Sequence, residues 1–187
     1  MKNATLPELI LAAEQMQVNS QRVFGALSVH QLNWKPSPDN WSVGQCFDHL
    51  MVSKEPYFKI IEQVLDGTKQ SSLWEKLPLW PSFIATQMIK TLQPGSGRQV
   101  KAPKAFRPSS SSIEADILQK FVSLEERWIN VLQRTANIDS AKVIITSPVA
   151  SVITYSLLDG MRLMAVHELR HFQQAERVLQ TTGFPLS

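Results

Sequence analysis

The chain has one cysteine, Cys46, among its 187 residues. One cysteine forms no intrachain disulfide and no CxxC zinc site, and nothing in the sequence indicates an oxidising compartment. The chain also carries little excess charge: its formal net charge is +3, and the Lys and Arg residues are scattered along the sequence. Since basic residues do not gather around aromatic ones, we expect no nucleic acid partner.

Long apolar runs are missing as well. No stretch reaches the roughly 18 apolar residues of a membrane-spanning helix, because the two most apolar segments, residues 77–89 and 143–158, are broken by proline or polar residues. The N-terminus turns amphipathic and acidic almost at once, without the apolar core and cleavage site of a signal peptide. We therefore expect a cytoplasmic protein with no membrane contact.

What the sequence does have is helical periodicity. Apolar residues recur at three- and four-residue steps in four segments, near residues 5–27, 42–67, 113–131 and 154–180. Ser42 followed by Gln45 is a capping-box pattern, Ser111 or Ser112 can cap the third segment, and Gly67 can end the second. Residues 141–147 are rich in β-branched side chains and can be briefly extended. The sequence predicts an all-α four-helix bundle that forms a single domain over residues 1–187.

Residues 68–108 have a different character, rich in tryptophan and proline, and form an insertion between the second and third helices. Since a structureless loop of this length is rare inside a compact domain, we expect a short helix over residues 81–92. The apolar surface around Trp80 and Phe83, together with the stripe at residues 113–131, predicts a twofold-symmetric homodimer.

The chain has four histidines, and two of them, His167 and His171, lie four residues apart in the last predicted helix. That interval places both side chains on one helix face. His49 lies in the second predicted helix, which can face the fourth, so three imidazoles can share one metal ion and leave a coordination position open. The alternative is that the pair consists of ordinary hydrogen-bonded histidines on a helix face. We expect no zincin motif and assign no glutamate as a general base.

Three residues near these histidines have more than one interpretation. Gln45 can line a substrate pocket, although its capping-box position favours a structural role. Cys46 can approach a metal ion, although a lone cysteine on a helix is more often a small buried hydrophobe. Gln174 shares the face of His167 and His171, so it can bind a water or a substrate group, or simply line the bundle. We carry Gln45 and Gln174 forward as candidate pocket residues.

Three segments, taken together, resemble the DinB-like superfamily: "NWSVGQCFDHL" at residues 40–50, "AFRP" at 105–108 and "AVHELRHFQQAERVL" at 165–179. The resemblance implies a four-helix bundle, often homodimeric, in which three histidines hold a divalent metal ion such as zinc or nickel. By position these are His49, His167 and His171. Some members transfer low-molecular-weight thiols such as bacillithiol, or act as thiol-dependent isomerases.

From this resemblance we expect a metal-dependent enzyme that acts on a small-molecule substrate, with thiol S-transfer as the first hypothesis. A metal-dependent hydrolase is the close alternative, and a non-enzymatic metal-binding bundle is the third. Access to the metal discriminates between them, because an open coordination position beside a pocket favours an enzyme and a closed shell favours a structural role.

Overall fold

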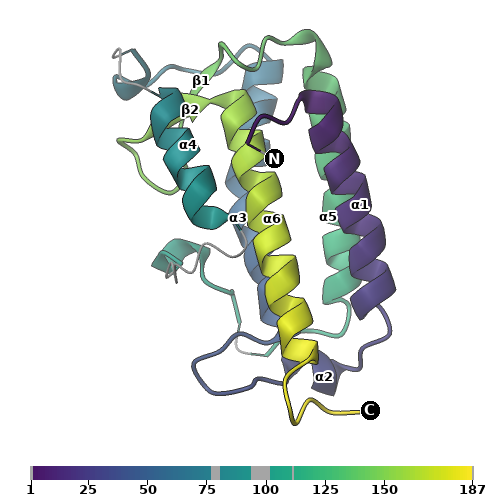
Figure 1. The fold of residues 1–187 in the computed structure, drawn as a ribbon. Helices are drawn as coiled ribbons and strands as arrows, with labels where there is room; N and C mark the ends of the chain where they lie inside the picture. The colour runs from purple at the N-terminus through teal and green to yellow at the C-terminus, as the bar shows by residue number, and fades with distance from the viewer. Residues whose placement is uncertain (1, 77–80, 94–101, 111, 187) are drawn as a thin grey trace.

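Four long helices dominate the computed structural model, which describes residues 2–76, 81–93, 102–110 and 112–186 (Figure 1). They are α1 (Leu6–Phe24), α3 (Val43–Leu65), α5 (Ile117–Arg134) and α6 (Leu157–Leu179). Helices α1 and α3 each pack against both α5 and α6. The predicted all-α bundle is confirmed.

The start of α3 follows from its capping residues. The backbone N–H of Gln45 donates to Ser42 Oγ at 3.2 Å, and the N–H of Ser42 donates to Gln45 Oε1 at 3.3 Å. This reciprocal pair satisfies two N–H groups that the first helical turn leaves without partners. The helix continues through Pro56 to Leu65, and the chain turns at Gly67 with φ of +68°, a conformation that glycine adopts without strain.

Short elements fill the ends of the bundle. Helix α2 (Val29–Asn33) lies near the C-terminus, at the opposite end from α4 (Pro81–Leu92) (Figure 1). Helix α4, the short helix predicted within the insertion, packs on α6 and on a two-stranded antiparallel sheet. That sheet consists of β1 (Ile144–Thr146) and β2 (Thr154–Ser156), and three 3-10 turns complete the described elements: η1 (Trp74–Lys76), η2 (Lys104–Phe106) and η3 (Thr135–Asn137).

The last helix begins later than predicted, at Leu157 instead of near Thr154. Residues 154–156 pair with β1, with Thr154 opposite Thr146 and Ser156 opposite Ile144. Ser156 then caps the helix, because its Oγ accepts a hydrogen bond from the N–H of Asp159 at 3.0 Å. Strand pairing therefore replaces the expected first helical turn.

The third long helix also begins later than predicted, at Ile117, with Asp116 as its N-cap. Ile113 lies outside the helix because the side chain of Asn33 binds both of its backbone groups. The Ile113 N–H donates to Asn33 Oδ1 at 2.7 Å, and Asn33 Nδ2 donates to the Ile113 carbonyl at 2.8 Å. Of the predicted caps, Ser112 is not the N-cap and Ser111 lies outside the described residues, as does Trp80 of the predicted dimer surface.

Two apolar clusters fill the bundle, one toward each end. One includes Tyr57 and Phe58 of α3, and the other includes Phe47 of α3 with Phe172 and Ala175 of α6. Between them the inward side chains of α3, α5 and α6 are polar or charged: His49, Ser53, Lys54, Glu125, Glu168 and His171, all buried. None of the helices in the described part of the chain is both long and apolar enough to cross a membrane.

Candidate metal centre

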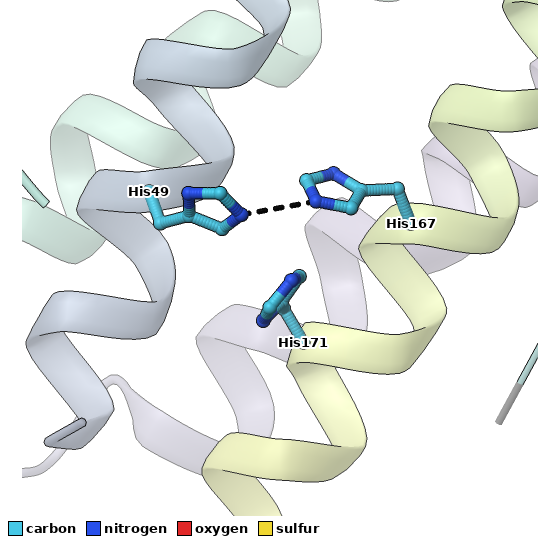
Figure 2. A group of neighbouring side chains, drawn as sticks. All are labelled: His49, His167 and His171. Carbon is cyan, nitrogen blue, oxygen red and sulfur yellow. Dashed lines mark hydrogen bonds between the residues drawn. The ribbon is translucent and has the colours of Figure 1, made fainter. Parts of the chain in front are cut away.

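Three histidine side chains converge between α3 and α6 (Figure 2). Helix α3 contributes His49, and α6 contributes His167 and His171 from successive turns. One ring nitrogen from each lies within 4.8 Å of the other two, and the Nε2 atoms of His49 and His167 are 3.0 Å apart. His30, the fourth histidine, lies exposed on α2 and is not in this group.

Hydrogen bonds at the far side of two rings fix their tautomers. His49 Nδ1 contacts the backbone carbonyl of Phe106, and because a carbonyl only accepts, Nδ1 carries the proton. His171 Nδ1 lies 2.9 Å from Gln174 Oε1, an acceptor of the same kind. Both rings therefore keep a bare Nε2 lone pair, the arrangement that oriented metal ligands adopt. The buried Nδ1 of His167 has no hydrogen-bond partner among the described residues.

The environment keeps all three imidazoles neutral. His49 is 3% exposed and His171 8% exposed. Burial lowers the pKa of His171 to about 3, with the neighbouring His49 adding to the effect. Burial also lowers the pKa of His49, and it lowers the pKa of His167 further, helped by the other two rings. A neutral imidazole is the form that binds a metal ion, so the lone pairs are available at neutral pH.

These donors fit a divalent metal ion. Two nitrogens that each lie about 2.0–2.1 Å from one zinc ion are separated by roughly 3.0–3.4 Å, and the observed Nε2–Nε2 distance is 3.0 Å. Two bare nitrogen lone pairs at that distance repel each other unless a proton or a cation lies between them. Three imidazole donors suit zinc, nickel, copper or iron and leave at least one coordination position for water or substrate.

An aromatic wall covers part of the cluster. Trp41, the residue before the N-cap of α3, stacks on His171 with ring centroids 5.5 Å apart and an interplanar angle of 25°. The same indole lies 4.7 Å from the ring of His49. No local pattern in the sequence indicates this contact. Trp41 and Gln45 also line an open cavity of 410 Å³ beside the cluster.

The end of the insertion is fastened to α3 at this site. The carbonyl of Phe106 meets His49, the N–H and Oγ of Ser109 donate to the carboxylate of Asp48, and Gln45 Nε2 donates to the Ser110 carbonyl at 3.1 Å. Three side chains from one stretch of α3 therefore hold residues 106–110. In the sequence, only the resemblance of "AFRP" to the family pointed to this stretch. Side-chain patterns do not report that the backbone carbonyl of Phe106 binds His49.

The two glutamines of the sequence analysis lie in different places. Gln174 stands behind His171, where it orients that ring. Gln45 lines the cavity and also closes the capping box. Cys46 is 1% exposed in the apolar core and outside the histidine group, and burial raises the pKa of its thiol to about 12. Cys46 is therefore a small buried hydrophobe and does not approach the histidines.

A buried charge cluster lies next to the histidines. Lys54 Nζ is 2.5 Å from Glu125 Oε1 and also contacts Glu168, and all three side chains are at most 4% exposed. Burial alone would lower the pKa of Lys54, but the two carboxylates outweigh it and raise that pKa. Burial raises the pKa of Glu125 to about 8, with the charge of Glu168 adding to it. The cluster ties α3, α5 and α6 together.

Glu168 also corrects the sequence analysis. Residues 167–171 read His-Glu-Leu-Arg-His, which matches the H-E-x-x-H pattern of zinc proteases position by position, so excluding that motif was wrong. In those enzymes the glutamate acts as a general base. Here its carboxylate binds Lys54 inside the bundle and is 3% exposed. The motif supplies two histidine ligands, but its glutamate is committed to an ion pair.

The fold and the site define a class: a helical bundle with a buried cluster of three histidines suited to a metal ion. The model of the DinB superfamily matches residues 12–175, and the chain belongs to that superfamily. Neither a curated protein nor a solved structure shows significant similarity to it.

Proposed function

We propose that the protein binds one divalent metal ion, zinc or nickel, through Nε2 of His49, His167 and His171. The tautomers carry this proposal: backbone and amide oxygens hold the protons of His49 and His171 on Nδ1, which leaves both Nε2 lone pairs directed into the cluster. A set of histidines with only a structural role has no need for this arrangement.

We further propose a metal-dependent transferase that acts on a low-molecular-weight thiol, in a cytoplasmic homodimer. A bound divalent ion lowers the pKa of a coordinated thiol or water and so supplies a nucleophile at neutral pH. The chain contributes the rest: the Phe106 carbonyl and the Gln174 side chain hold the rings of His49 and His171, and Trp41 shields one side of the cluster. Thiol transfer needs no general base, since the thiolate itself is the nucleophile.

Hydrolysis is the second candidate, and the H-E-x-x-H match at residues 167–171 favours it. That chemistry needs a base to take a proton from water. Glu168, the position that serves in zinc proteases, is bound to Lys54 and buried. The geometry therefore supports thiol chemistry better than zincin-type hydrolysis.

Two measurements test the proposed function. Elemental analysis of protein purified without a histidine tag should find about one equivalent of metal, which should be lost as the pH falls because protons compete for the imidazoles. Thiol consumption should then be followed with bacillithiol, cysteine and glutathione against an electrophile, with metal-loaded protein, metal-free protein and His171→Ala compared. Equal rates for the three samples would refute metal-dependent thiol transfer.

A further inference from the structure

The cavity beside the histidine cluster has a second chemical character. Its walls come from the α2–α3 connection, the first turn of α3 and the segment that closes the insertion. Trp41 belongs both to these walls and to the shell around the histidines, where its ring packs on His49 and His171. A molecule in the cavity therefore touches the same indole that covers the proposed metal site.

Two cations line this cavity. They are Lys35, from the α2–α3 connection, and Arg107, from the closing segment, and Asp39 is the one carboxylate in the lining. Among the residues that the structure describes, no carboxylate lies within ion-pair distance of Lys35 or Arg107. Arg107 Nε donates to the Ala102 carbonyl at 3.3 Å, which leaves the two terminal nitrogens of the guanidinium for a ligand. The cavity thus has a net positive lining.

The rest of the lining favours an organic anion over an inorganic one. Trp41, Pro38 and Pro108 give the cavity apolar surface, and Ser109 and Ser110 add polar groups. A volume of 410 Å³ lies in the range of small-molecule sites, about 300–1,000 Å³. A bare phosphate or chloride ion would use neither the indole nor most of this volume.

Residues 106–110, the closing segment that carries Arg107, are held by side chains of α3 at the proposed metal site. Phe106, the preceding residue, accepts the hydrogen bond from His49, and Ser109 is bound to Asp48 in the same turn of α3. The backbone on both sides of Arg107 is therefore held against the ligand-bearing helix, and its side chain extends from that fixed stretch. Arginine is the side chain best suited to a carboxylate, because its planar fork can donate two parallel hydrogen bonds.

We propose that Lys35 and Arg107 bind a carboxylate group of a small organic molecule held in this cavity, against the indole of Trp41 that also packs on His49 and His171. The carboxylate subsite is defined by the cavity alone, and its use by a substrate of the metal centre rests on the proposed function. It narrows the substrate class to small carboxylic acids, and for thiol chemistry to thiols that carry a carboxylate.

Isothermal titration calorimetry with mercaptosuccinate, which has a thiol and two carboxylates, tests the proposal on zinc-loaded protein. 1-Thioglycerol, an uncharged thiol of similar length, is the matched probe. Arg107→Ala and Lys35→Ala should each weaken mercaptosuccinate binding about tenfold, the loss of one charge-assisted hydrogen bond. Both variants should leave 1-thioglycerol binding unchanged. Lys104→Ala, which removes an exposed lysine three residues before Arg107 and outside the cavity lining, is the control and should bind both probes as the wild type does.

Succinate separates this inference from the proposed function, because it has carboxylates and no thiol. It should bind wild-type protein with or without zinc, and should lose affinity in Arg107→Ala. If the protein holds no metal but succinate still depends on Arg107, the metal proposal fails and the carboxylate subsite stands. If zinc is bound and neither Arg107→Ala nor Lys35→Ala weakens mercaptosuccinate binding relative to Lys104→Ala, the carboxylate subsite is refuted.

Discussion

Replacing Lys54 with methionine removes the cation from the buried charge cluster and keeps most of the volume of the side chain. The wild-type ammonium is 1% exposed and contacts the carboxyl groups of Glu125 and Glu168, which are almost fully buried themselves. Without it, the two acidic side chains share the core with no cation between them, and the negative charge that balanced the ammonium loses its partner. Breaking a buried ion pair from one side costs about 3–5 kcal/mol, because the remaining charge has lost its solvent and its partner.

The size of this effect translates into a thermal shift. For a chain of this length, 1 kcal/mol lowers the melting temperature by roughly 2–4 °C, so we expect a fall on the order of 10 °C for Lys54→Met. Lys142→Met is the matched control, since Lys142 pairs with Asp139 at the surface and is 84% exposed. The control should melt with the wild type, because exposed ion pairs contribute little.

The assay is thermal unfolding followed by circular dichroism, on metal-free protein so that metal binding adds nothing. A third variant, with Lys54→Met, Glu125→Gln and Glu168→Gln combined, removes every charge of the cluster and should recover much of the lost stability. The reasoning is refuted if Lys54→Met melts with Lys142→Met. It is also refuted if the triple variant melts below Lys54→Met, because unpaired charge would then not be the cause.

Three further predictions concern single side chains. Burial raises the pKa of Glu125 from 4.5 to about 8, so between these pH values the folded protein keeps a proton that the unfolded chain releases. The contribution of Glu125 to stability is therefore complete below pH 4.5 and is lost as the pH rises toward 8. The melting temperature of metal-free Glu125→Gln should therefore fall less between pH 5 and pH 8 than that of the wild type. The same fall in both proteins would contradict the raised pKa of Glu125. Cys46, with a pKa of about 12, should resist Ellman's reagent at pH 8 until guanidinium unfolds the protein, and rapid labelling of native protein would show that the thiol is not buried as described. Gln174→Leu removes the acceptor behind His171 and should weaken zinc binding about tenfold, whereas Gln174→Glu keeps an acceptor and should retain it; equal zinc affinity in all three proteins would exclude an orienting role for Gln174.

Much of the fold was predictable because local signals agreed with the tertiary structure. The capping box at Ser42 and the glycine at position 67 bracket α3, and the short helix of the insertion runs over the predicted residues, Pro81–Leu92. The errors lie where distant residues override local preference. Ile113 is withdrawn from α5 by the side chain of Asn33, which is 80 residues away in the chain.

The same distinction holds at the site. The interval between His167 and His171 is a local property, so the pair was visible in the sequence. Three other contacts depend on which helices meet, and the periodicity of the sequence does not indicate them. They are the Phe106 carbonyl on His49, the Trp41 indole on His171 and the pairing of Lys54 with Glu168. Position in the fold therefore decides the role of Glu168, since its sequence motif alone would assign a general base.

Metal quantitation on single alanine variants tests the central claim most directly. Tag-free wild type, His49→Ala, His167→Ala, His171→Ala and His30→Ala should each be checked for intact helical content and then loaded with zinc and dialysed. The account predicts about one equivalent of zinc in the wild type and in His30→Ala, and a loss of most of it in the other three, because two imidazoles hold a divalent ion far more weakly than three. Stoichiometric zinc surviving in folded His49→Ala, His167→Ala or His171→Ala would contradict the three-histidine centre.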